Sequence, residues 1–227
     1  MAQPAATEAD RRTDGSGRSW AAILGATGLP LVGEGGSRVR VAQAAPLPLG
    51  IVGEREVVDA YLSERRTATD VRLAVSSALP REWLLVDLHD VWVGAPAAPA
   101  AVVAAEYRVL VEGAPRWALE GAVLALLAAG SLPRERHRDK RTVAYDLRPL
   151  LLDLRVRGAG GEGVTLAMRL RHAPDAVGRP EEVVAALAEP PARPSSAPLV
   201  VRSVVRERLV MVDDLDAPRA APAPASR

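Results

Sequence analysis

Cysteine and phenylalanine are both absent from this chain of 227 residues, and Lys140 is its only lysine. Without cysteine, the chain itself can form no disulfide, no thiolate nucleophile and no iron–sulfur ligand set. The remaining basic residues are all arginine, a skew that is typical of GC-rich coding sequences. The abundance of arginine therefore does not by itself indicate a nucleic-acid-binding protein.

Histidine and long apolar runs are also scarce. The histidines are His89, His137 and His172, and none has a second histidine or a carboxylate at a metal-like spacing within its own segment. We therefore expect no metal site and no cofactor. No apolar run approaches the length that spans a bilayer, and the first residues lack the apolar core of a signal peptide. These features predict a cytoplasmic protein without a membrane partner.

The distribution of small and polar residues predicts two units between two tails. Residues 1–18 and 213–227 lack apolar periodicity, so we expect disordered tails there. The segment GAPAAPAA at 94–101 has the composition of a linker. The expected units are then residues 19–93 and 102–212. The chain carries a net charge of +1, and its basic surplus falls in the second unit.

The most informative stretch is residues 134–156, which join a charged turn to a long strand-like run. Val143, Tyr145 and Leu147 alternate with polar or small residues, as in a strand with one apolar face. After Pro149 the apolar row continues with the opposite parity. Because proline cannot donate to a sheet ladder, we predict a bulge or bend at Arg148 and Pro149.

The order of predicted elements indicates the fold class. The second half reads strand, helix, strand, strand, helix, strand, and the first half repeats this order from its helix onward, ending in an alternating strand at 84–93. We predict an α+β protein built from two tandem ferredoxin-like (βαββαβ) units, the first lacking its opening strand. Trp83, Trp92 and Trp117 are expected to fill the core or a domain interface.

Two groups of residues are candidates for a site. The first is the charged turn, which could contact RNA phosphates or simply be a solvated hairpin that protects a sheet edge. Its basic residues are Arg134, Arg136, Arg138, Lys140 and Arg141. The second is Asp146 with Arg148, two residues apart on one strand face, which could orient a ligand or form a structural pair at the bend. No nucleophile lies in a catalytic context, so no catalytic residue is assigned.

Several ordered motifs resemble one bacterial family. They are GLPL at 28–31, APLPLGIVGEREVVD at 45–59, SALP at 77–80, the stretch from 134 to 154, and GRPEEVVAAL at 178–187. Together they resemble the radical-SAM-linked protein family, an uncharacterised domain found alone or at the C-terminus of cobalamin-binding-type radical SAM proteins. The chain departs from that family in lacking its opening basic, aromatic strand and the aromatic, asparagine and proline motif between GLPL and LPLG.

Three functions follow as hypotheses. The first, which the resemblance implies, is a non-catalytic accessory or binding module that is associated with a radical SAM enzyme and contacts RNA. Alternatives are a protein-interaction or assembly subunit without nucleic acid, and an enzyme with an unrecognised site in the cleft between the units. One continuous basic face would favour RNA, whereas scattered arginines paired with carboxylates would favour protein interaction or plain solubility. The sequence predicts no oligomeric state.

Overall fold

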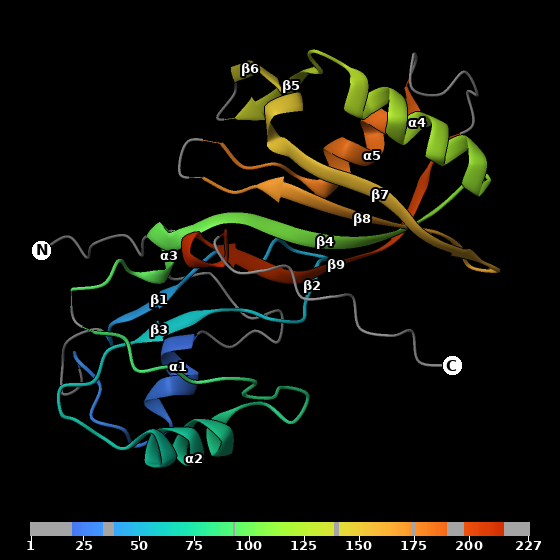
Figure 1. Cartoon of the computed structure of the whole chain (residues 1–227). Coiled ribbons are helices and arrows are strands. Elements are labelled where there is room, and N and C mark those ends of the chain that lie inside the picture. The colour runs from blue at the N-terminus through green and yellow to red at the C-terminus, as the bar shows by residue number, and fades with distance from the viewer. Residues whose placement is uncertain are drawn as a thin grey trace, which may run out of the picture.

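The computed structural model describes residues 20–33, 39–92, 94–138, 141–173, 176–189 and 198–215, without the side chains at 137, 138, 141 and 215. It has mixed α+β architecture, which confirms the α+β part of the predicted fold class. Its centre is a five-stranded sheet in the order β2-β9-β4-β8-β7 (Figure 1). The two expected tails at 1–18 and 213–227 lie almost wholly outside the described residues.

The second half supplies four of the five strands of this sheet. Its elements are β4 (Val102–Glu112), α4 (Arg116–Ala128), β5 (Pro133–Arg138), β6 (Arg141–Asp146), η2 (Arg148–Leu150), β7 (Leu151–Gly160), β8 (Gly163–Arg171), α5 (Pro180–Ala188), β9 (Val200–Met211) and η3 (Val212–Leu215). β4 pairs antiparallel with both β8 and β9, and β7 pairs antiparallel with β8. The hairpin β5-β6 forms a separate two-stranded sheet between α4 and β7 in the chain.

The two helices of the second half, α4 and α5, cover one face of the sheet (Figure 1). On α4, Leu119, Ala122 and Leu126 recur at helical spacing and are buried in the main core. Val183 and Leu187 of α5 join the same core. β4 turns alternate residues toward these helices, so Tyr107, Val109 and Val111 are buried, while the intervening residues lie on the opposite face.

The bend predicted at Pro149 is a single turn of 3₁₀ helix, η2. The backbone N–H of Leu150 donates to Leu147 O at 3.0 Å. Leu147 and Leu150 are buried on either side of the turn. The bend therefore allows both leucines to lie in the core as the chain passes from β6 into β7.

The first half packs beside the sheet and forms a small cluster of its own. Its elements are α1 (Trp20–Gly25), β1 (Val41–Gln43), β2 (Val52–Gly53), β3 (Val58–Ala60), α2 (Ala68–Ala78) and α3 (Ala98–Ala101). β1 pairs only with β3, and β2 runs parallel to β9 at the edge of the large sheet. Leu24, Leu29, Leu31 and Val75 centre the small cluster. The two halves thus share a sheet, and α3 occupies the expected linker.

The prediction of a strand at 84–93 is wrong for the residues that the structure describes, because residues 84–92 form no strand. The run is extended, but no neighbouring strand among the described residues pairs with it. Alternation alone cannot create a strand without a partner for the backbone groups. Within the described ranges, no helix is long and apolar enough to cross a membrane.

Candidate functional site

The charged stretch that the sequence singles out is a β-hairpin fastened to α5. The guanidinium of Arg136 donates to both carboxylate oxygens of Glu182, from Nη2 at 2.9 and 3.0 Å, and from Nε to Oε1 at 3.2 Å. Its Nη2 also donates to Val177 O at 3.3 Å. Arg134 Nη2 lies 3.2 Å from Glu189 Oε2. Both arginines are therefore already paired with carboxylates of helix α5 or its end.

The surroundings of Arg136 keep it charged. Burial would lower the pKa of its guanidinium, but the hydrogen bonds and charge of Glu182 outweigh burial and raise it. The guanidinium carbon lies 4.8 Å from the centre of the Tyr145 ring, a cation–π arrangement. Burial, followed by the nearby Glu182, raises the pKa of Tyr145 to about 12. Arg138, Lys140 and Arg141 cannot be placed in this cluster, because their side chains lie outside the described residues.

Asp146 and Arg148 act on the backbone at the bend. The carboxylate of Asp146 accepts the N–H groups of Leu132 at 2.7 Å and Arg148 at 2.9 Å. These two backbone bonds are the main reason that the pKa of Asp146 is lowered. The Arg148 guanidinium donates to the carbonyls of Leu127 and Leu151 at 3.1 and 2.9 Å. Both side chains thus hold backbone groups at the bend through their hydrogen bonds.

The arginines of the large sheet form a network with carboxylates on the face away from α4 and α5. Six arginines and six carboxylates take part: Arg108, Arg155, Arg157, Arg169, Arg202 and Arg208, with Glu54, Glu106, Glu112, Asp153, Glu207 and Asp214. The described network is therefore electrically balanced. It spans β4, β7, β8 and β9 and reaches residues just after β2 and in η3. We call this surface the charged sheet face.

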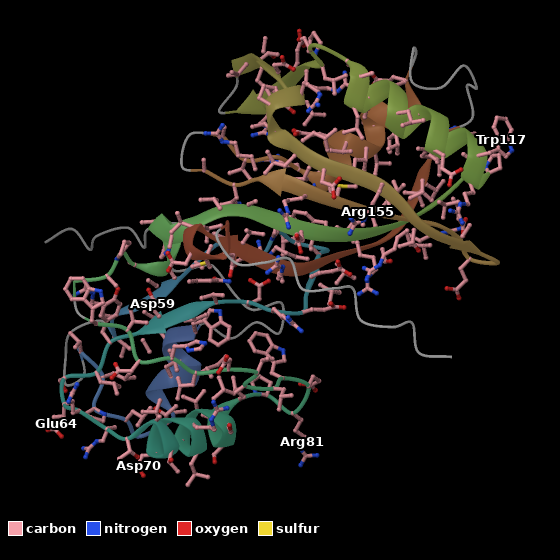
Figure 2. The ribbon with its side chains drawn as sticks, viewed as in Figure 1. Asp59, Glu64, Asp70, Arg81, Trp117 and Arg155 are labelled. Atoms are coloured by element: carbon pink, nitrogen blue, oxygen red, sulfur yellow. The ribbon has the colours of Figure 1, made fainter. Side chains whose placement is uncertain are left out.

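Glu106 is the centre of the charged sheet face. Arg208 Nε donates to its Oε2 at 2.8 Å, and Arg169 Nε donates to its Oε1 at 2.9 Å. A shallow hollow beside it is lined by Glu106, Asp153, Arg155, Arg169 and Glu207, among others. Arg155 is labelled in Figure 2, on the side of β7 and β8 away from α4. This hollow thus exposes both positively and negatively charged side chains to a binding partner.

The Glu106 carboxyl gives the charged sheet face a pH dependence. Burial would raise its pKa, but hydrogen bonds from Arg208 and then Arg169 lower it below 4.5. A carboxyl whose folded pKa is depressed stabilises the protein above its unfolded pKa, and this contribution is lost as the pH falls through the folded pKa.

We expect Glu106→Gln to lower the free energy of unfolding by about 1 kcal/mol at pH 7 and by less below pH 4. Urea titrations followed by circular dichroism at both pH values measure this difference. Glu120→Gln, which alters an exposed pair with Arg116 on α4, is the control. A loss that is the same at both pH values contradicts the assignment.

One arginine of β9 differs from the others because it points into the core. Arg206 is 1% exposed and is paired with Glu56, which follows β2 in the chain. It donates from Nε to Glu56 Oε1 at 2.9 Å, and to the carbonyls of Ala45 and Pro46 at 2.9 and 3.1 Å. The sequence analysis assigned no role to this arginine. Alternation gave no signal for its burial, because Arg202 and Arg208 have the same strand parity and lie on the charged sheet face.

Two further titratable groups lie near this buried pair. Burial is the main cause that raises the pKa of Tyr107, against an opposing effect of Arg206. Burial and then the charge of Arg206 lower the pKa of His172, which favours its neutral form. Its Nδ1 has no hydrogen-bond partner among the described residues. In the same part of the chain, no group of three or more histidine, aspartate or glutamate residues is placed to hold a metal ion.

Two of the tryptophans pack on each other, and two lie at the surface. Trp83 packs against Trp20 with ring centroids 5.0 Å apart. Trp92 and Trp117 are largely exposed, so the prediction that they fill the core or a domain interface is wrong for both. Figure 2 shows Trp117 projecting outward from the start of α4.

A comparison with known protein families matches more than half of the chain. No curated protein matches the chain. A family model described as "Uncharacterized protein conserved in bacteria (DUF2344)" matches residues 36–180, more than half of the sequence. This match runs from the segment before β1 to the first residue of α5, and includes Glu56, Glu106 and the charged hairpin. The chain belongs to this bacterial family of uncharacterised conserved proteins.

Proposed function

We propose that the protein is a non-catalytic protein-binding module that receives its partner on the charged sheet face. The observation that carries this proposal is the balance of six arginines and six carboxylates on the sheet face opposite α4 and α5. A balanced surface has no net attraction for a polyanion, because phosphate binding depends on a local surplus of positive charge. Arginine is also enriched at protein interfaces, where its fork can exchange one carboxylate for another.

The non-catalytic part of the proposal rests on what the candidate polar groups do. Asp146 and Arg148 hold backbone groups at the bend, and Arg134 and Arg136 hold α5. These groups are engaged in structural interactions, which supports a binding protein over an enzyme.

The partner we propose is a radical SAM enzyme, and a cytoplasmic location goes with it. This rests on the resemblance of the motifs at 45–59, 134–154 and 178–187 to the radical-SAM-linked family. We further propose that β4, α4, β7, β8, α5 and β9 are one ferredoxin-like unit with β5-β6 inserted, and that the first half is an incomplete second unit. The strand order β9-β4-β8-β7 supports the first of these assignments.

The experiment is co-purification of the tagged protein with the radical SAM enzyme encoded in the same genome. The test variant is Arg155→Glu with Arg157→Glu, since both side chains are exposed and belong to the charged sheet face. The matched control is Arg116→Glu, which reverses an equally exposed charge on α4. We expect the wild type and the control to retain the enzyme, and the test variant to bind it roughly tenfold more weakly or worse. Equal retention by the test variant overturns the proposed surface.

A second arm tests RNA contact. Labelled bulk tRNA and ribosomal RNA are titrated across a salt series, beside a variant with alanine at Arg136, Arg138, Lys140 and Arg141. We expect no tight binding at physiological salt, because Arg136 is committed to Glu182. Binding that weakens steeply with salt and is lost in the variant would instead assign the hairpin to RNA.

A further inference from the structure

Residues 84–92 have the pattern of a strand but no strand beside them. Leu84, Val86, Leu88 and Trp92 alternate with residues of the other face. The segment is extended, yet no strand of the described residues pairs with it. Two of its backbone groups are engaged locally: the N–H of Leu88 donates to Asp87 Oδ1 at 2.8 Å, and the carbonyl of Trp92 accepts from the N–H of Ala95 at 3.0 Å. The other backbone groups of 84–92 have no partner among the described residues, and an unpaired strand-like segment can pair with another chain.

The apolar residues of this segment are exposed. Leu84 is 83% exposed and Trp92 76%, and Val86 and Val91 are exposed by more than half. The segment is nonetheless held in place, because Leu85 packs on the small cluster and Trp83 packs on Trp20. An anchored, extended segment with an exposed apolar row is the arrangement that accepts a further strand.

The sequence of the segment is complementary to itself. If two copies run antiparallel with Leu88 on a two-fold axis, the cross-strand pairs are Leu84 with Trp92, Leu85 with Val91, Val86 with Asp90, and Asp87 with His89. An aliphatic residue then faces an aromatic one, and an acid faces an imidazole, which are both favourable cross-strand pairs. Moving the register by one residue in one direction, or by two in the other, places aspartate against aspartate, which is unfavourable.

We propose that residues 84–92 pair with the same segment of a second copy of this chain, in antiparallel register about Leu88. A two-fold interface needs a surface that matches itself, and this register provides one. Asp87 and His89 lie on one row of the segment, with His89 Nε2 at 3.0 Å from Asp87 Oδ2. In the dimer, Asp87 of each copy faces His89 of the other copy, so this acid–imidazole pair occurs twice. This surface is separate from the charged sheet face, and the inference does not rest on the proposed function.

The test is the molecular mass of the full chain in solution, by sedimentation velocity and light scattering over a micromolar concentration series. We expect a reversible dimer. His89→Asp places aspartate opposite Asp87 on both sides of the two-fold axis, and we expect it to weaken the dimer by roughly tenfold or more. The double variant Asp87→His with His89→Asp restores an acid opposite an imidazole and should recover the wild-type dissociation constant within about threefold.

Both exchanged side chains are largely exposed, at 64% and 77%, so neither variant should disturb the fold, and circular dichroism checks this. Leu84→Ser should weaken the dimer, whereas Leu73→Ser, an exposed leucine on α2, should not. A wild type that stays monomeric throughout the series overturns the proposal. A dimer that is unaffected by His89→Asp, or that the double variant does not restore, overturns it as well.

Discussion

Arg206→Met is expected to lower the free energy of unfolding by about 3–5 kcal/mol. The substitution leaves the Glu56 carboxylate, only 13% exposed, without its cation. The carbonyls of Ala45 and Pro46 lose their donors at the same time. Urea unfolding followed by circular dichroism measures the loss. Removing one member of a buried ion pair costs more than the pair contributes, because the remaining charge is stranded in a poorly solvated site.

Arg202→Met is the matched control for this prediction. Arg202 lies on the same strand and pairs with Glu112, but its side chain is 56% exposed. We expect its loss to be about 1 kcal/mol or less. The double variant Glu56→Leu with Arg206→Met removes both buried charges and should regain part of the stability lost in Arg206→Met. If Arg206→Met and Arg202→Met unfold at the same urea concentration, the pair does not have the structural role that its burial indicates.

The stability of this pair matters because it joins the two halves of the chain. Arg206 belongs to β9, whereas Glu56 and the carbonyl groups of Ala45 and Pro46 belong to the segment between β1 and β3. β2, in the same segment, adds its short ladder to β9. Loss of the pair should therefore free the segment that holds the first half against the sheet.

The second half could be predicted from the sequence because its signals are local. Pro180 with two following glutamates marks the start of α5, and the glycines from 158 to 163 mark the β7-β8 turn. Alternation in the sequence marks β4 and β8, whose apolar rows lie in the main core. In each case the residues that define the element also determine its burial.

The first half could not be predicted as well, because its outcome depends on distant partners. A run such as 84–92 satisfies every local rule for a strand, and whether it becomes one depends on a neighbour. β2 shows the converse case, since its two residues form a strand only because β9 lies beside them. Local alternation does not encode either pairing.

The same distinction applies to the candidate site residues: contacts between residues close in the sequence could be predicted, and contacts between distant residues could not. Asp146, the last residue of β6, and Arg148, the first of η2, lie together at the bend, because residues this close in the sequence stay together in any fold. The sequence could not foresee that Arg136 would meet Glu182, which lies 46 residues away. The burial of Arg206 was hidden for the same reason, because its acid is 150 residues away.

Gly163→Ala is expected to destabilise the protein by about 1–3 kcal/mol, and more if the backbone cannot shift. Gly163 begins β8 with a φ of +125°, a conformation that residues with a Cβ rarely adopt. A Cβ here would stand 2.4 Å from the carbonyl oxygen of Val111 on β4. Thermal and urea unfolding measure the loss.

Gly160→Ala is the control, because Gly160 lies directly opposite Gly163 at the end of the hairpin. No atom lies within 4 Å of a Cβ built there, and its φ is not positive. We expect its unfolding free energy to stay within about 0.5 kcal/mol of the wild type. The β7-β8 hairpin also sets Arg155 opposite Ala167 on the charged sheet face, so a shifted turn should weaken partner binding as well. Equal stability of the two alanine variants would show that the turn does not require the glycine conformation at 163.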